Sequence, residues 1–214
     1  MKKFLFIFLF FILNIFSQEN DPLLVNIADR INQKKWVDST YNKMSLDQKI
    51  GQLFMPMVFS RKDSTHYIAF LKLIKKYHIG GVIFSLGSPY KQTKWLNSFQ
   101  KNSKTPLLVG MDAEWGVSMR LDSVMSFPWN MTLGAIRDTS LIRKIGFRMG
   151  VQEKRLGVHI SFSPVLDINT NPSNPIIGNR SFGESKKLVT NHGIALMQGH
   201  HQAGILTSGK HFPG

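Results

Sequence analysis

The chain has 214 residues, of which 43% are hydrophobic and 19% are charged, with 17 glycines, 9 prolines and no cysteine. This composition excludes disordered, collagen-like and disulfide-stapled proteins, and the lack of cysteine excludes thiol nucleophiles, thiolate metal sites and a lipid-modified N-terminal cysteine. The net charge is +14, from 27 Lys and Arg against 13 Asp and Glu, but the positive residues are scattered singly or in short groups, so we expect a solvated basic surface and no nucleic-acid partner.

The first 17 residues have the pattern of a secretory signal peptide. Lys2 and Lys3 precede an apolar run over 4–13, and Ser17 leads into a polar stretch. The apolar run is much shorter than the roughly twenty residues that a bilayer-spanning helix needs. We therefore expect cleavage near Ser17 and export to the periplasm or the medium, with no stable membrane anchor after cleavage.

After a lead-in helix or linker over 18–43, apolar strands and amphipathic helices alternate along the chain. Apolar runs predict strands over 50–59, 80–85, 106–112, 159–165 and 205–210. Apolar residues at helical spacing predict helices over 67–77, 91–101, 141–156 and 185–203. Strands that are apolar on both faces and alternate with helices are typical of a parallel sheet in an α/β fold.

Two parallel-sheet architectures fit this alternation, an open doubly wound sheet and a (β/α)8 barrel. A dinucleotide-binding doubly wound sheet requires a G-x-G-x-x-G turn after its first strand, and the sequence has none there. Polar residues instead follow three of the strands: Asp112 the third, Asp167 the fourth, and Lys210 and His211 the fifth. Functional groups of barrels collect at this end of the strands, so we expect residues 44–214 to form a TIM-like barrel truncated to roughly its first five β/α units.

Asp112 and Glu114 stand two residues apart at the end of the third predicted strand and are a candidate carboxylate pair. Residues with this spacing share one face of a strand, and retaining glycosidases use two carboxyl groups about 5–5.5 Å apart. The alternative is a surface or helix-capping pair, because Glu114 falls where the strand is expected to turn. The neighbouring Trp115 offers either a ring face on which a sugar could pack or a core side chain.

Basic residues are expected near this pair at the mouth of the barrel. Arg120 follows Asp112 by eight residues, Arg180 lies in a glycine-flanked turn, and Lys210 and His211 follow the fifth strand. Lys and Arg donate hydrogen bonds to hydroxyls or carbonyls, and an aspartate accepts them from hydroxyls. The set therefore suits a polyhydroxylated ligand.

The last predicted helix carries three histidines, His192, His200 and His201. Two histidines that share a metal on one helix face stand three or four residues apart, and these do not. His211 taken alone is more often a structural histidine than a ligand or a base. We expect no metal and no cofactor.

Six short motifs occur in order along the chain. They are MSLDQKIGQL at 44–53, GGVIF at 80–84, DAE at 112–114, PVLD at 164–167, GNRSFG at 178–183 and KHFPG at 210–214. With these motifs the chain resembles the N-terminal barrel of glycoside hydrolase family 3, closest to its β-N-acetylglucosaminidase (β-N-acetylhexosaminidase) branch. The resemblance runs from Met44 to the last residue.

The resemblance implies that Asp112, Arg120, Arg180, Lys210 and His211 hold the terminal sugar of a glycan, which is hydrolysed with retention of configuration. The family's nucleophile, an aspartate after a later strand, and the branch's acid/base, a histidine on a loop beyond KHFPG, have no counterpart in the 214 residues. The resemblance therefore assigns no catalytic residue here, and it implies an N-terminal fragment that binds sugar without completing the reaction. The local DAEWG also departs from the branch's DQEGG, with a tryptophan in place of a glycine.

Three function classes stay open at this point. The first is an exported hydrolase that removes terminal β-linked N-acetylglucosamine-type sugars from glycans or cell-wall fragments, or a related β-glucosidase-type enzyme. The second is a non-catalytic sugar-binding relative. The third is a basic surface-binding module, whose association with its partner would depend steeply on salt.

Overall fold

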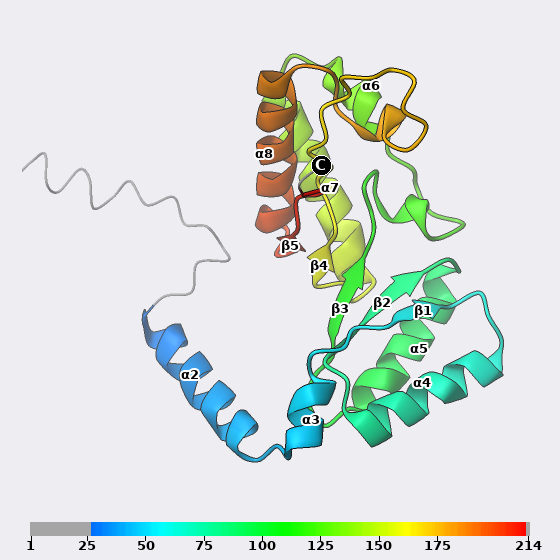
Figure 1. The fold of residues 1–214 in the computed structure, drawn as a ribbon, viewed down its shortest axis with the longest axis vertical. Helices are drawn as coiled ribbons and strands as arrows, with labels where there is room; N and C mark the ends of the chain where they lie inside the picture. The colour runs from blue at the N-terminus through cyan, green and yellow to red at the C-terminus, as the bar shows by residue number, and fades with distance from the viewer. Residues whose placement is uncertain (1–26, 213–214) are drawn as a thin grey trace, which may run out of the picture.

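A parallel sheet of five strands runs through the computed structural model, which describes residues 27–212 (Figure 1). The strands are β1 (Met57–Phe59), β2 (Gly81–Ser85), β3 (Leu108–Met111), β4 (Ile160–Ser161) and β5 (Leu206–Thr207). They lie in the order β1-β2-β3-β4-β5, and every neighbouring pair is parallel. The signal peptide predicted over 1–17 lies outside the described residues.

The order of the strands distinguishes the two architectures that the sequence left open. In a doubly wound sheet the spatial order of the strands reverses at a switch point, whereas in a barrel each new strand is added to the same edge. Here the spatial order follows the chain order throughout. This confirms the predicted α/β fold and the TIM-like succession of five β/α units.

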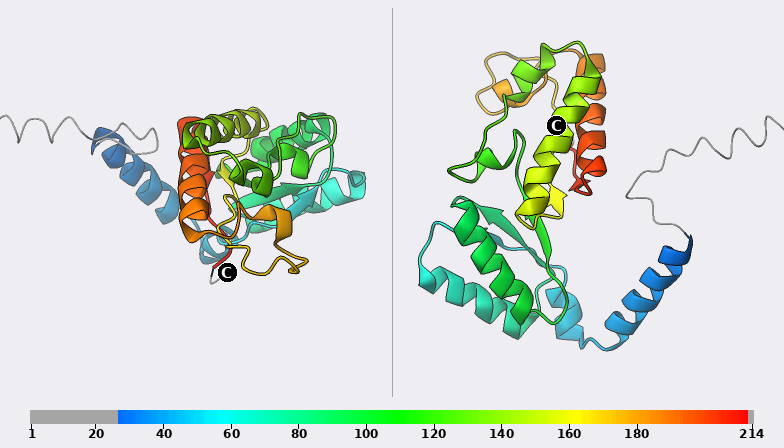
Figure 2. Two further views of the ribbon diagram at one scale, coloured as in Figure 1. Left: turned by 90° about the horizontal axis from the view of Figure 1, so that it is seen from above. Right: turned by 180° about the vertical axis from the view of Figure 1, so that it is seen from behind.

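Helices flank the sheet along its whole width. They are α2 (Ile27–Asn42), α3 (Leu46–Gly51), α4 (Ser64–Tyr77), α5 (Pro89–Asn102), α6 (Asn130–Gly134), α7 (Thr139–Arg155) and α8 (Lys186–Gln202), with 3₁₀ turns η1 (Val117–Met119) and η2 (Gly178–Arg180). Figures 1 and 2 show α4 and α5 beside β1 and β2, and α7 and α8 beside β4 and β5. The four helices predicted from apolar spacing are confirmed as α4, α5, α7 and α8.

Three of these helices begin two or three residues before the predicted start because a polar residue caps each N-terminus. The Asp63 carboxylate accepts hydrogen bonds from the first turn of α4, the Ser88 hydroxyl from that of α5, and the Asp138 carboxylate from that of α7. A side chain of this kind satisfies backbone N–H groups that have no partner inside the helix. The caps therefore set the helix boundaries that apolar spacing alone left imprecise.

The first predicted strand, over 50–59, is wrong in its first part. Ile50 belongs to α3, and only Met57–Phe59 pair with β2. A capping box starts this helix, since the Ser45 hydroxyl accepts from Gln48 N at 3.3 Å and the Gln48 side-chain oxygen accepts from Ser45 N at 3.1 Å. The capping box stabilises a helical turn over the residues that follow it, although their hydropathy is equally compatible with a strand.

The last two strands are shorter than the predicted 159–165 and 205–210. Pro164 has no N–H to donate to a neighbouring strand, which ends the regular ladder after β4. Beyond it, Val165 still pairs with Lys210 in an isolated parallel bridge. This bridge keeps the segments after β4 and β5 side by side as they enter the polar end of the sheet.

The buried core falls into two clusters. The first joins β1, β2 and β3 to α4 and α5, and Phe99 lies at its centre, stacked with Tyr67, Phe70 and Phe84 at ring-centroid distances of 5.5, 6.1 and 6.3 Å. The second joins α6, α7, α8 and the segment after η2, and its fully buried members include Ile142, Met149, Leu196 and Phe182. The first cluster thus holds β1, β2 and β3 against their helices, and the second holds α6, α7 and α8 together.

Glycines allow α7 and α8 to pack with their backbones in close approach. A methyl group added at Gly146 of α7 would overlap the carbonyl oxygen of Leu196, and one added at Gly199 of α8 would overlap the carbonyl oxygen of Arg143. In both cases the obstacle is backbone, which cannot move aside by a change of rotamer. Only glycine fits at these two positions without displacing a helix.

Helix α2 differs from the other described helices in its position relative to the sheet. In Figures 1 and 2, α2 extends from α3 away from the sheet, and its Trp36 is 54% exposed. Among residues 27–212, no helix is long and apolar enough to cross a membrane.

We predict that Gly146→Ala destabilises the protein by about 1–3 kcal/mol, because the added methyl group forces α7 and α8 apart. The higher helix propensity of alanine favours the variant by only about 1 kcal/mol. Urea unfolding followed by circular dichroism measures the difference, with Thr190→Ala on the exposed face of α8 as the matched control. A variant as stable as the wild type would contradict the close helix approach.

Candidate functional site

Charged side chains from four separate segments meet beyond the carboxyl ends of β3, β4 and β5. Asp112 follows β3, Asp167 follows β4, and Lys210 and His211 follow β5, while Arg180 ends η2. Glu114 and Arg120 come from the segment between β3 and α6. Together these seven side chains form a continuous network of ion pairs and hydrogen bonds, here called the charged network.

Asp112 is held by two cations, one at each carboxylate oxygen. Arg120 Nη2 donates to Oδ2 and Lys210 Nζ donates to Oδ1, both at 2.8 Å. Burial alone would raise the pKa of Asp112, but the hydrogen bonds and charges of Lys210 and Arg120 outweigh it, so the pKa lies below its usual value. Asp112 is therefore an ionised acceptor at neutral pH, and its side chain is still 23% exposed.

Glu114 is more deeply buried than Asp112, with only 1% of its side chain exposed. Arg180 donates two hydrogen bonds to the Glu114 carboxylate, from Nε to Oε2 at 2.8 Å and from Nη2 to Oε1 at 2.7 Å. Lys210 Nζ lies 2.8 Å from the same Oε1. Burial raises the pKa of Glu114, but the hydrogen bonds from Arg180 and Lys210 outweigh it and lower that pKa. The expectation of a surface or helix-capping pair is wrong, because the buried Glu114 joins two cations from distant segments.

The same contacts bear on the idea that Asp112 and Glu114 act as a catalytic pair. If two carboxyl groups alone carry out a retaining mechanism, one of them carries a proton at the start of the reaction. Both carboxylates here have a lowered pKa and are paired with cations. Their chemistry suits binding and positioning, not proton donation.

His211 connects the charged network to Asp167. Its Nδ1 lies 2.7 Å from Asp167 Oδ2, and its backbone N donates to the same oxygen at 3.1 Å. Its Nε2 lies 3.3 Å from Arg180 Nη2. Because a guanidinium can only donate, Nε2 is the acceptor and Nδ1 carries the proton, which it donates to Asp167. The pairing therefore selects one neutral tautomer of His211.

The segment that carries Arg180 is fixed at its backbone as well. The Asn130 amide, at the start of α6, donates to the Arg180 carbonyl at 2.8 Å, and the Ser181 hydroxyl donates to the Asp167 carbonyl at 2.6 Å. The hydrogen bond to Glu114 raises the pKa of Arg180. The backbone and the guanidinium of Arg180 are thus both fixed by hydrogen bonds in the absence of a ligand.

The structure brings together all five residues predicted to bind the ligand, Asp112, Arg120, Arg180, Lys210 and His211. Their predicted role as sugar ligands stays a prediction. The set of residues predicted to bind the sugar did not include two members of the charged network, Glu114 and Asp167, although the sequence had drawn attention to both. The two-residue spacing from Asp112 pointed to Glu114, and the position after the fourth strand in PVLD pointed to Asp167.

The charged network keeps hydrogen-bonding capacity on its open side. Arg120, Arg180 and Lys210 are 24%, 23% and 18% exposed, and His211 is 42% exposed. An ammonium has three protons, and Lys210 uses two of them on Asp112 and Glu114, which leaves one for a ligand. The site thus offers several donors beside a carboxylate acceptor, an arrangement that matches the hydroxyls of a sugar.

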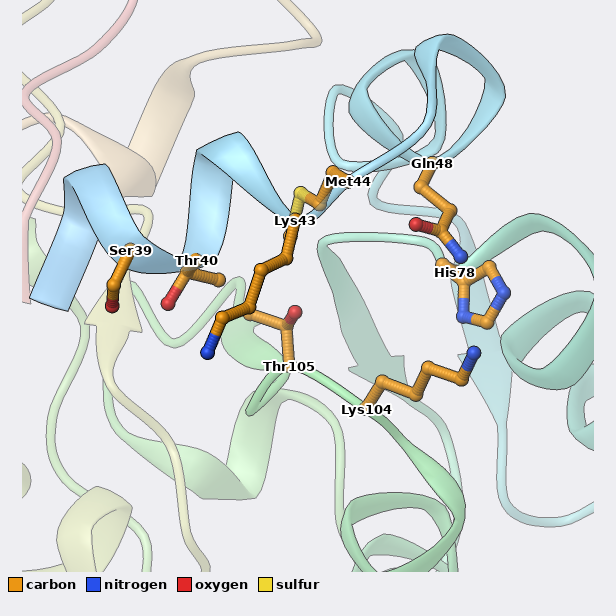
Figure 3. A pocket seen from close by; sticks show the side chains of 8 residues that line it. All are labelled: Ser39, Thr40, Lys43, Met44, Gln48, His78, Lys104 and Thr105. Carbon is orange, nitrogen blue, oxygen red and sulfur yellow. The ribbon is translucent and has the colours of Figure 1, made fainter.

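A separate pocket of about 330 Å³ lies at the opposite end of the strands (Figure 3). It is lined by Ser39, Thr40, Lys43, Met44, Gln48, His78, Lys104 and Thr105. Thr105 precedes β3, whereas Asp112 follows it, so this pocket and the charged network do not share a surface. Within residues 27–212, no group of three or more His, Asp or Glu side chains is arranged to hold a metal ion.

Comparisons with known proteins relate the chain to sugar-processing enzymes. Residues 45–214 match the model of the glycosyl hydrolase family 3 N terminal domain. The chain is 30% identical over 179 residues to a beta-N-acetylglucosaminidase/beta-glucosidase of Cellulomonas fimi, covering 84% of this chain and 31% of that protein.

Two solved structures extend this likeness to the fold. A glycoside hydrolase family 3 beta-N-acetylglucosaminidase from Paenibacillus sp. str. FPU-7 is 36% identical with a TM-score of 0.71, covering 80% of this chain and 34% of that one. Beta-glucoside phosphorylase BglX bound to 2FGlc is 28% identical with a TM-score of 0.78, covering 86% of this chain and 33% of that one. The chain therefore spans about a third of the length of each of these relatives.

We predict that Glu114→Gln lowers the free energy of unfolding by about 2 kcal/mol at neutral pH, because Arg180 loses its anionic partner while the shape is kept. The folded pKa of Glu114 is depressed, so its ionised form stabilises the protein fully above the unfolded pKa of about 4.3, and this contribution is lost as pH falls through the folded value.

The stability difference between wild type and Glu114→Gln should therefore shrink as pH falls from 6 to below 4. Urea unfolding at several pH values measures it, with Glu184→Gln at an exposed glutamate as the control. A difference that stays constant across this range would show that the charge of Glu114 does not stabilise the fold.

Proposed function

This chain belongs to glycosyl hydrolase family 3, and we propose that it forms the sugar-binding part of an exported hydrolase that removes terminal β-linked N-acetylglucosamine-type sugars from glycans or cell-wall fragments. The observation that carries the proposal is the charged network, in which Asp112 is held ionised between Lys210 and Arg120 with its open side facing solvent. Relatives named as beta-N-acetylglucosaminidases support the choice of sugar.

In the proposed complex, Asp112 accepts hydrogen bonds from hydroxyls of the terminal ring, and Lys210, Arg180 and Arg120 donate to its oxygens. Hydrogen bonds that involve a charged group are about twice as strong as neutral ones. Glu114 has no exposed oxygen to offer a ligand, and its part is to fix Arg180 and Lys210. Because these groups are already paired, binding costs little further ordering.

The proposal assigns the two chemical steps to groups outside the 214 residues. A retaining hydrolase forms a covalent bond between the sugar and a carboxylate and then releases it with water, using an acid/base group. The relatives are about three times as long as the part of them that this chain matches, which leaves room for both groups elsewhere. On this proposal the 214 residues alone bind sugar and do not hydrolyse it.

Two relatives bear on the sugar that is preferred. One is named for both N-acetylglucosaminidase and glucosidase activity, and another is a beta-glucoside phosphorylase. A comparison of aryl β-N-acetylglucosaminide with aryl β-glucoside as substrates separates the proposed preference from a β-glucosidase. A protein that binds these sugars but turns over neither would be the non-catalytic alternative.

Export is part of the proposal and is supported by the lysines and the apolar run before Ser17. We predict that the protein recovered from its native host begins at or near Gln18. Intact-mass measurement of the N-terminus checks this. A mature protein that keeps Lys2 and Lys3 and stays in the cytoplasm would contradict export.

We predict that Asp112→Ala lowers kcat/KM on an aryl β-N-acetylglucosaminide by about 100-fold in the hydrolase that contains this chain, since two charge-assisted hydrogen bonds to the sugar are lost. The exposed Asp122→Ala is the matched control and should change kcat/KM less than twofold. Thermal unfolding of both variants checks that the fold is intact. Unchanged kinetics in a folded Asp112→Ala protein would rule out the proposed site.

A further inference from the structure

Two tryptophans, each next in the sequence to a residue that contacts Arg180, pack against each other. The rings of Trp115 and Trp129 have centroids 4.0 Å apart and planes inclined at 34°. Trp115 directly follows Glu114, and Trp129 directly precedes Asn130, whose amide donates to the Arg180 carbonyl. Both indoles therefore stand one residue away from groups that hold Arg180.

The segment between these tryptophans folds back on itself. Gly116 has a φ of 86°, in the left-handed region that favours glycine, and a side chain there would collide with the Phe127 ring. Arg120, which holds Asp112, lies within this same segment. The segment that starts with this turn therefore connects Arg120 of the charged network to the tryptophan pair.

The two indoles differ in how they are supported. Trp115 is partly buried and packs against the apolar cluster of α6, α7 and α8, whereas Trp129 is 44% exposed. The Ile176 carbonyl accepts a hydrogen bond from Arg180 Nη1 at 3.1 Å, and the Ile176 side chain is 68% exposed. Trp129 and Ile176 are therefore exposed apolar side chains in two segments that contact Arg180. Neither side chain is among the buried residues of the two core clusters, and exposed apolar groups next to a polar site are candidates for ligand contact.

We propose that Trp129, backed by Trp115, is a stacking platform for the second sugar ring of a β-linked oligosaccharide, the ring to which the terminal sugar is attached. This inference rests on the proposed function and adds a specificity-determining residue to it. The C–H face of a pyranose is apolar, and burying it against an indole removes both surfaces from water. The charged network supplies no such surface, so the two elements bind different rings.

The test compares binding of a one-ring and a two-ring ligand to the 214-residue chain, which requires no catalysis. Isothermal titration calorimetry measures Kd for N-acetylglucosamine and for its β1,4-linked dimer. Trp129→Ala should weaken binding of the dimer by about tenfold and of the monomer by less than twofold. Trp129→Phe should restore most of the affinity for the dimer, because it keeps an aromatic face. Trp36→Ala, at an exposed tryptophan of α2, is the matched control and should change neither.

The outcomes separate this inference from the proposed function. If Asp112→Ala abolishes monomer binding while Trp129→Ala leaves dimer binding unchanged, the proposed site stands and the platform is wrong. Equal weakening of both ligands by Trp129→Ala would also overturn the platform, since it would indicate damage to the whole site. If the wild-type chain binds neither ligand, the proposed function and the platform fail together.

Discussion

The Nζ atom of Lys210 is the contact on which the arrangement of the site depends. It lies 2.8 Å from a carboxylate oxygen of Asp112, 98 residues earlier in the chain, and 2.8 Å from one of Glu114. Two carboxylates this close would each raise the pKa of the other, but three cations surround them and both keep a lowered pKa. Because Lys210 follows β5 and both acids follow β3, the ammonium also links these strands across β4.

Much of the framework around this contact could be predicted from local sequence patterns. The apolar runs located β2 and β3, and helical spacing located α4, α5, α7 and α8. Parallel strands bring their carboxyl ends to one edge, and this rule alone predicted that Asp112, Lys210 and His211 would be neighbours. The rule works because it depends on topology and not on the details of any side chain.

The parts that could not be predicted depend on contacts between distant segments. The burial of Glu114 is set by Arg180, 66 residues later, and no local pattern encodes that partner. The position of Asp167 after the fourth strand was predicted, but its contacts with the backbone N and ring Nδ1 of His211, 44 residues later, were not. The strand predicted over 50–59 failed for the opposite reason, since the cap at Ser45 is local but outweighs the hydropathy of the residues after it.

The turn at Gly116 begins a connection whose sequence could change the preference for different ligands among related chains. The residues between Arg120 and α6 carry the exposed indole, while Arg120 itself, the paired acids and Lys210 lie outside that stretch. A change in the length or composition of the connection after Arg120 would reshape the surface around Trp129 and leave the residues of the ion pairs in place. On the proposed function, recognition of the leaving portion of a ligand would therefore vary independently of the groups that bind its terminal sugar.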